Sequence, residues 1–415
     1  MKRPITHAHA CCIMLLLVLE FLSRVFSVKV PAAFGYASTR MILAALTTLL
    51  LTITIGPWMI RKLYLLKTGQ SIRVEACPFL ADLHQHKKKT PTMGGALILC
   101  SMLIALLLWM DWKSSFTLLL LMTTVWLGFL GGIDDYLKMK RKSSRGIRSR
   151  YKFCLQVAFS TLFALYLFYP VVTKVIQIGD WFSPPVVKAQ FLEHEHQVSD
   201  DDGQQGYGYY YVPFKKNPLV FLSGWQVIGA IVITVLVVTG ASNAVNLSDG
   251  LDGLAAGLVL LVAIVFAVFA FLSNHSEIAA YLNIASIKGS VEIGVYLCAM
   301  AGACLGFLWY NGYPAQVFMG DTGSLALGGI LGVAAVLLQR EFLLALVGGV
   351  FVLEAGSVIL QVLSYRYRNR KRIFRCTPLH HHFEFKGWPE PTVVLRFWII
   401  GWILALIGLA SLKFQ

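Results

Sequence analysis

Apolar runs of about 20 residues alternate with short polar segments along most of the chain. A run of this length is what an α-helix needs to cross the hydrocarbon core of a membrane. We count ten runs, near residues 38–60, 92–112, 115–133, 151–171, 218–240, 250–272, 291–310, 322–338, 341–363 and 393–413. The pattern predicts an all-α, polytopic integral membrane protein of about ten transmembrane helices, with residues 38–415 forming one domain.

Two segments depart from this pattern. Residues 11–27 carry Glu20 and Arg24 in an otherwise apolar run, which favours a helix lying in the membrane interface over a span or a cleaved signal. We therefore assign residues 1–37 to an N-terminal external or interfacial segment. Residues 172–217 form a polar insert containing "DDDGQQGYGYYY", which is typical of a flexible external loop.

The composition agrees with a membrane protein. Hydrophobic residues make up 57% of the 415 positions and charged residues 14%, whereas soluble proteins carry about 25% charged residues. The eight cysteines form no CxxC pattern, so we interpret them as small buried hydrophobic residues, not as metal ligands or disulfides.

The basic residues predict the orientation in the membrane. Segments 61–91, 134–152 and 364–392 hold 22 of the 36 Lys and Arg residues. With ten spans, all three segments lie on one side, which is the cytoplasm by the positive-inside rule. The insert at 172–217 and both termini then lie outside.

The stretch "NAVNLSDGLDGLA" places Asn243, Asn246, Asp249 and Asp252 three residues apart, between two apolar runs. One interpretation is a solvated turn in which Ser248 or Asp249 caps the second helix. That interpretation explains one acid and one amide but leaves the even spacing unexplained. Because charge beside hydrocarbon is costly, we favour a functional cluster on the cytoplasmic side.

Three more polar clusters are predicted on the same side. They are Asp134 and Asp135 where the third span ends, Asp321 at the start of the eighth, and the run His380, His381 and His382. An Asp at a helix C-terminus opposes the helix dipole, so a role for the Asp pair is favoured over a solvated helix end. Carboxylates beside basic side chains are typical of sites that hold an anionic substrate with Mg²⁺, as in phosphoryl transfer.

Alternatives exist for two of these clusters. Asp321 could cap the short eighth helix, and a cap and a Mg²⁺ ligand are compatible roles. The three histidines could bind a soft metal, but adjacent side chains diverge and Cys376 is the one thiol nearby. We favour imidazoles in an extended loop that bind phosphate or pyrophosphate, with His380 and His381 needed more than His382.

Six motifs follow one another in the order "KKTPTMGG", "GGIDDYLK", "NAVNLSDGLDGLA", "WYNGYPAQVFMGDTGSLALGG", "ILQVLSYRYR" and "RCTPLHHHFEFKGWPEP". Together they resemble the phospho-N-acetylmuramoyl-pentapeptide-transferases, the MraY family. The wider superfamily of polyprenyl-phosphate sugar-1-phosphate transferases shares the acidic motifs. The motifs "TPTMGG" and "TPLHHHFEFKGWPEP" point to the muramoyl-pentapeptide branch.

The resemblance implies a reaction and a cofactor. The expected reaction transfers phospho-MurNAc-pentapeptide from UDP-MurNAc-pentapeptide to undecaprenyl phosphate, giving lipid I and UMP in the first membrane step of peptidoglycan synthesis. The expected cofactor is Mg²⁺. The expected location is the inner (plasma) membrane of a bacterium, with the active site facing the cytoplasm.

The resemblance also implies roles for individual residues. The expected catalytic residues are Asp134, Asp135, Asp321, His380 and His381, with Asp321 as the metal ligand and Asp134 as a candidate base. Phe318 is expected to stack on the uracil. The expected substrate-binding residues are Lys87, Lys89, Thr92, Lys138, Lys152, Asn243, Asn246, Asp249, Asp252, Asn311, Phe318, Gly320 and His382.

Two other functions stay open from the residues alone. A related transferase that uses UDP-GlcNAc would share the acidic motifs. A secondary transporter would also carry polar residues in its helices, but near the membrane midplane and with an internal repeat, which we do not find here. The expected partners are the two substrates and the lipid bilayer, and no nucleic-acid partner is expected. A homodimer is one arrangement that the sequence leaves open.

Overall fold

The computed structural model describes residues 14–15, 25, 32–66, 90–141, 146–169 and 208–413. The residues outside these ranges include Lys87, Lys89, most of the predicted N-terminal segment 1–37 and most of the insert at 172–217. The expectations for them therefore stay predictions.

Each of the ten apolar runs contains a helix. The long helices are α2 (Ala37–Leu65), α4 (Gly95–Trp109), α5 (Ser115–Arg141), α6 (Ser149–Phe168), α8 (Val227–Ser248), α9 (Leu254–Asn274), α11 (Val291–Asn311), α12 (Gly320–Leu337), α14 (Gly349–Tyr367) and α16 (Glu390–Ala410). In the described part of the chain, nine of them are long and apolar enough to cross a membrane, and α4, with 15 residues, is shorter. The all-α, polytopic membrane class is confirmed.

Short elements connect the long helices. They are η1 (Ala32–Gly35), β1 (Tyr209–Tyr210), β2 (Val220–Phe221), η5 (Gly224–Gln226), α10 (Ser276–Tyr281), α13 (Glu341–Val347) and α15 (Leu379–Glu384). β1 and β2 pair antiparallel. The last residues of the insert are thus part of a small hairpin, which corrects the expectation of a flexible loop for that portion.

Helices α9, α11 and α12 form the buried centre. In the apolar windows of α2, α6, α8, α14 and α16, only 28–33% of the residues are buried. Lipid offers no hydrophobic force that drives helices together, so close backbone contact through small residues matters. Gly302 and Gly306 on α11 lie against α2, and a Cβ atom at Gly302 would stand 2.1 Å from the carbonyl oxygen of Ala45. Gly328 and Gly332 lie in the same way on α12 against α8.

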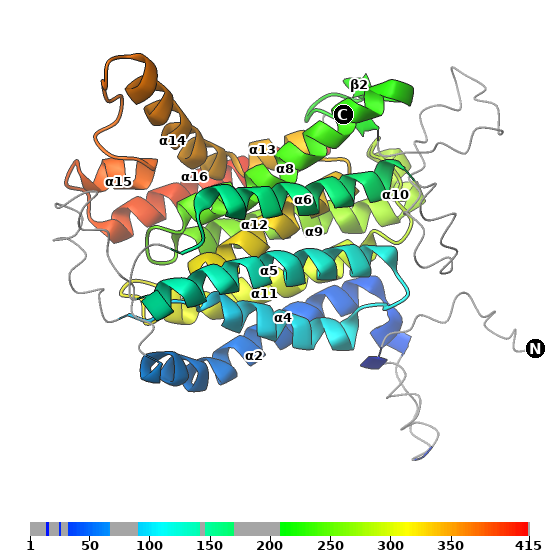
Figure 1. The fold of residues 1–415 in the computed structure, drawn as a ribbon. Helices are drawn as coiled ribbons and strands as arrows, with labels where there is room; N and C mark the ends of the chain where they lie inside the picture. The colour runs from blue at the N-terminus through cyan, green and yellow to red at the C-terminus, as the bar shows by residue number, and fades with distance from the viewer. Residues whose placement is uncertain are drawn as a thin grey trace, which may run out of the picture.

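Several helix boundaries differ from those predicted. α8 continues to Ser248, so Asn243 and Asn246 lie within a helix and not in the expected loop. The ninth apolar run, 341–363, is divided at Gly348 into α13 and α14. α14 then runs obliquely to the neighbouring helices (Figure 1).

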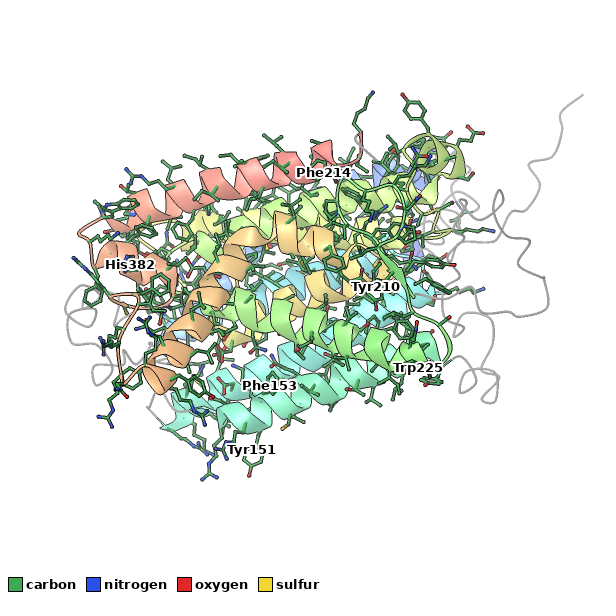
Figure 2. All side chains as sticks on the ribbon, turned by 90° about the horizontal axis from the view of Figure 1, so that it is seen from above. Tyr151, Phe153, Tyr210, Phe214, Trp225 and His382 are labelled. Carbon is green, nitrogen blue, oxygen red and sulfur yellow. The ribbon has the colours of Figure 1, made fainter. Side chains whose placement is uncertain are left out.

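The bundle has two distinct ends. α15 lies at one end, and α10 and β2 lie at the other (Figure 1). Seen from above, His382 marks the α15 end, and Tyr210 and Trp225 lie toward the α10 end (Figure 2). The helices run between these ends, so the C-terminal turns of α5 and α8 reach the α15 end together with the first turns of α6 and α12.

Candidate active site

Three carboxylates from two helices meet at the α15 end. Asp134 and Asp135 lie on α5, and Asp321 lies in the first turn of α12. One oxygen of each lies within 4.8 Å of the others. Among the residues that the structure describes, this is the one group of His, Cys, Asp or Glu side chains close enough to hold a metal ion. Three carboxylates suit Mg²⁺, which prefers hard oxygen ligands.

The Asp pair is not at a helix end. α5 continues through Lys138 to Arg141, so the sequence argument that placed the pair at a C-terminus was wrong. Both side chains are instead 2% exposed, within the protein interior. Burying two adjacent carboxylates needs cations or hydrogen-bond donors nearby, and the structure supplies both.

Asp321 is the centre of the cluster. Its Oδ2 atom accepts hydrogen bonds from Lys138 Nζ at 2.8 Å and from Lys152 Nζ at 2.5 Å. Its Oδ1 atom accepts one from Asn246 Nδ2 at 2.8 Å. Donors from α5, α6 and α8 therefore converge on one carboxylate of α12. Two cations beside a group of acids form a local environment suited to phosphate and a divalent metal.

Asp134 shares these lysines. Its Oδ2 atom lies 2.6 Å from Lys138 Nζ and 3.9 Å from Lys152 Nζ. Its Oδ1 atom accepts the backbone N–H of Ile147 at 2.6 Å. A lysine and a backbone N–H therefore each pair with one oxygen of this buried side chain.

Asp135 bonds to the start of helix α12, unlike Asp134. Its Oδ1 atom accepts the backbone N–H of Asp321 at 3.2 Å. Its Oδ2 atom accepts both the backbone N–H and the hydroxyl of Thr322, at 2.9 and 2.7 Å. A carboxylate at this point satisfies free N–H groups of the first turn of α12 and favours its positive dipole end. Asp135 thus anchors the helix that carries Asp321.

The four evenly spaced polar residues take separate partners. Asn246 reaches Asp321 and also Ser324 Oγ, at 2.8 Å. Asn243 instead donates to Gln156 Oε1 at 2.8 Å and to the carbonyl oxygen of Thr239. The even spacing therefore does not form one row of ligands. Asn243 and Asn246 lie on successive turns of helix α8, and Asp249 and Asp252 lie in the connection that follows the helix.

Asp249 and Asp252 lie after α8 ends. Burial raises the pKa of the Asp249 carboxyl well above its ordinary value, and the charges of Asp321 and Asp135 add to this shift. Asp252 Oδ2 accepts the backbone N–H of Ala315 at 3.0 Å. α9 begins after Gly253 without a side-chain cap, so the capping interpretation of Ser248 or Asp249 is wrong.

Three of the other predicted binding residues lie around the start of α12. Gly320 has a φ of +73°, and a Cβ atom there would stand 2.7 Å from Asp135 Oδ2 and 2.8 Å from Thr92 Oγ1. Glycine is required by both the backbone conformation and the space. The backbone of Phe318 pairs with Pro91 and Gly94, which holds the start of α4 against this segment.

Asn311 links two segments. Its Oδ1 atom accepts the backbone N–H of Gly253 at 3.0 Å, and its Nδ2 atom donates to the carbonyl oxygen of Val317 at 2.8 Å. The side chain is buried. Asn311 therefore supports the loops that carry Asp252 and Phe318.

The histidines lie on the short helix α15, which corrects the expected extended loop. His380 is fully buried and contacts Glu354. His381 Nδ1 lies 2.7 Å from Glu384 Oε2. His382 Nδ1 accepts the backbone N–H of Arg375 at 3.2 Å, and burial lowers its pKa, together with the charges of Lys386 and Arg375. None of the described histidines belongs to a group of three or more candidate metal ligands, which gives the soft-metal alternative no support.

Sequence reasoning missed three polar residues of this region. Gln156 and Glu354 lie within largely apolar helices, and a polar or acidic residue inside a membrane span is itself a signal of function. Ser324 carries no such signal, because its role depends on Asn246 from another helix.

A carboxylate cluster with two lysines at one end of a membrane bundle forms a membrane-embedded site for charged substrates, of the kind that phosphoryl-transfer enzymes use. A family model described as glycosyl transferase family 4 matches residues 117–339, which contain all three carboxylates. The chain is 56% identical, over 97% of its length and the whole of the relative, to the phospho-N-acetylmuramoyl-pentapeptide-transferase of Protochlamydia amoebophila (strain UWE25). It is 42% identical to that of Syntrophus aciditrophicus (strain SB), over 92% of this chain and 95% of the relative. The chain belongs to the phospho-N-acetylmuramoyl-pentapeptide-transferase family, which confirms the resemblance and removes the transporter alternative.

Proposed function

We propose that this protein transfers phospho-MurNAc-pentapeptide from UDP-MurNAc-pentapeptide to undecaprenyl phosphate, forming lipid I and UMP. An oxygen of the lipid phosphate bonds to the phosphorus that carries the sugar, and the bond from that phosphorus to the UMP oxygen breaks. One phosphoanhydride replaces another, so the step needs no other energy source. The observation that carries the proposal is the convergence of Lys138, Lys152 and Asn246 on Asp321, in a membrane protein with these relatives.

We further propose that Mg²⁺ binds at Asp321, with Asp134 beside it. The donor set fits this ion, because carboxylate oxygens of three residues lie within 4.8 Å of one another. When bound, Mg²⁺ would neutralise negative charge on the phosphate oxygens. Asp135 has both oxygens engaged by the backbone and hydroxyl of α12, so its role is to hold Asp321 in place.

The lysines supply the remaining charge. Lys138 and Lys152 are partly exposed, at 28% and 14% of their side-chain surface, and can turn from the carboxylates to an incoming diphosphate. Lys152 comes from α6 and Lys138 from α5, so the two can contact different oxygens of the same substrate. The acceptor phosphate has a second pKa of about 6, so near neutral pH it arrives mostly as a dianion and needs little help from a base.

The test is reconstitution. Purified protein in detergent micelles, given UDP-MurNAc-pentapeptide, undecaprenyl phosphate and Mg²⁺, should release UMP and form lipid I. UDP-GlcNAc in place of the muramoyl substrate is the specificity control. Lys152→Gln should reduce turnover strongly, whereas Lys113→Gln, the same change at an exposed residue before α5, should not. Turnover of UDP-GlcNAc alone would refute the proposal in favour of a related transferase.

The cytoplasmic position of the site is also a proposal. It follows from the three basic segments and the positive-inside rule. Cysteine labelling with an impermeant reagent in intact cells should reach a cysteine introduced at Lys216 and not one introduced at Arg370. Both residues are exposed, so a reversed result would place the site outside.

A further inference from the structure

One buried acid near the site has no role in the chemistry described so far. Glu354 lies on α14, and both Glu354 and His380 are 0% exposed. Glu354 Oε1 accepts the backbone N–H of His380 at 3.2 Å, and Glu354 Oε2 lies 3.1 Å from His380 Nδ1. A single side chain of α14 therefore holds both the backbone and the ring of His380.

This contact selects the tautomer of His380. An ionised carboxylate can only accept hydrogen bonds. Because Glu354 faces Nδ1, that nitrogen must carry a proton for the contact to be favourable. The other nitrogen, Nε2, is buried and has no hydrogen-bond partner. A proton on Nε2 would be an unsatisfied buried donor, which is costly, so the neutral ring with bare Nε2 is favoured.

The bare nitrogen faces the turn between α8 and α9. A Cβ atom at Gly250 would stand 2.3 Å from His380 Nε2, so the Gly250 backbone packs directly on the ring. Gly250 follows Asp249, whose carboxyl interacts electrostatically with Asp321 and Asp135. A path of direct contacts thus runs from Glu354 through His380 to the turn that borders the carboxylate cluster.

We propose that Glu354 is a positioning residue that acts through His380, holding its Nδ1–H tautomer and seating the ring against Gly250 so that the Asp249–Asp252 turn keeps its place beside Asp321. This inference rests on the proposed function for its kinetic part only. It also changes the expectation for His380. With Nε2 bare, the neutral ring cannot donate an N–H from that nitrogen to pyrophosphate, so its contribution is to the shape of the turn.

The test combines a spectroscopic and a kinetic measurement. In wild-type protein labelled with ¹⁵N-histidine, the His380 resonances, assigned by their loss in His380→Gln, should show a protonated Nδ1 and an unprotonated Nε2. Glu354→Gln keeps the size of the side chain but presents an amide to the ring. It should move the proton to Nε2 and lower kcat about 10- to 100-fold, the range typical when the partner that orients a metal-binding histidine is removed. The Mg²⁺ concentration for half-maximal activity should stay unchanged.

Glu341→Gln is the matched control, because it makes the same change at another buried acid, on α13. It should leave both the His380 resonances and kcat unaltered. A protonated Nε2 in wild-type protein would overturn the proposal, and so would full activity in Glu354→Gln with the tautomer reversed. If Glu354→Gln does not fold, the wild-type spectrum still decides the tautomer. If wild-type protein makes no lipid I, the proposed function is wrong. The ¹⁵N spectrum would still determine the tautomer of His380.

Discussion

Replacing Asp321 with Asn should abolish most activity by weakening Mg²⁺ binding while leaving the fold intact. The change preserves shape and removes one charge. In the structure the carboxylate accepts hydrogen bonds from two lysines and one amide. Asn can keep the contacts of one oxygen only and cannot offset two positive charges. Lys138 and Lys152 would then repel an incoming cation, with Asp134 and Asp135 as the remaining acids of the cluster.

The size of the effect follows from Coulomb's law. At an effective dielectric constant of about 20, a carboxylate about 4 Å from a divalent cation contributes roughly 8 kcal/mol. The two lysines already neutralise part of the Asp321 charge, so we take about half of this value. About 4 kcal/mol corresponds to a roughly 1000-fold rise in the Mg²⁺ concentration needed for half-maximal activity.

The assay is UMP release across a Mg²⁺ titration, with Mn²⁺ binding to the purified protein followed directly by electron paramagnetic resonance. Asp111→Asn is the control, because it makes the same change in the α4–α5 connection. That position is about 30 Å from Asp134 along α5, at 1.5 Å per residue. Thermal unfolding should be similar for the three proteins. If Asp321→Asn needs the same Mg²⁺ concentration as wild type and binds Mn²⁺ equally, the metal assignment is wrong.

Three further outcomes are expected. Asp134→Asn should reduce the turnover rate more near pH 6 than at about pH 8.5, because a base matters most where the acceptor phosphate is protonated. An equal reduction at both pH values would mean that Asp134 acts by charge or position. Asp135→Ala should lower the free energy of unfolding by about 2–5 kcal/mol, because two backbone N–H groups and the Thr322 hydroxyl lose their acceptor; an unchanged unfolding temperature would contradict its anchoring role. Burial raises the pKa of Glu341 from its ordinary value of 4.5 to about 8, so the folded state holds this proton more tightly than the unfolded state. The Glu341 contribution to the free energy of unfolding is therefore complete below about pH 4.5 and is lost as the pH rises to about 8. The loss is at most about 5 kcal/mol. Unfolding measured from pH 5 to pH 8 should show this loss in wild type and a flatter profile in Glu341→Gln.

The sequence by itself determined the all-α membrane class and the position of each apolar helix, whereas nine of the ten predicted spans are long enough to cross a membrane in the described part of the chain. An apolar run long enough to cross the membrane has few alternatives to a helix, because no water is present to pair with its backbone groups. All ten runs accordingly contain one. The ends of the helices were less certain, because they depend on what each end meets. α5 extends through Lys138 to Arg141 since these charged residues lie beyond the apolar core.

The residue types of the candidate site were also visible in the sequence. The pattern of the sequence predicts Asp134, Asp135, Asp321 and Asn246, and the family resemblance adds Lys138 and Lys152. The structure brings these six residues together. Acids and amides in or beside membrane spans are costly without a purpose, so their positions are informative before any contact is known.

Which of these residues touch, and in what role, was decided by tertiary structure. Asp134 and Asp135 are neighbours in sequence, yet one pairs with lysines and the other anchors α12. Asn243 and Asn246 lie one turn apart, yet only Asn246 reaches Asp321. The partners come from helices distant in the chain, and the packing of small residues between those helices sets which side chains meet. No periodicity in a single segment contains that information.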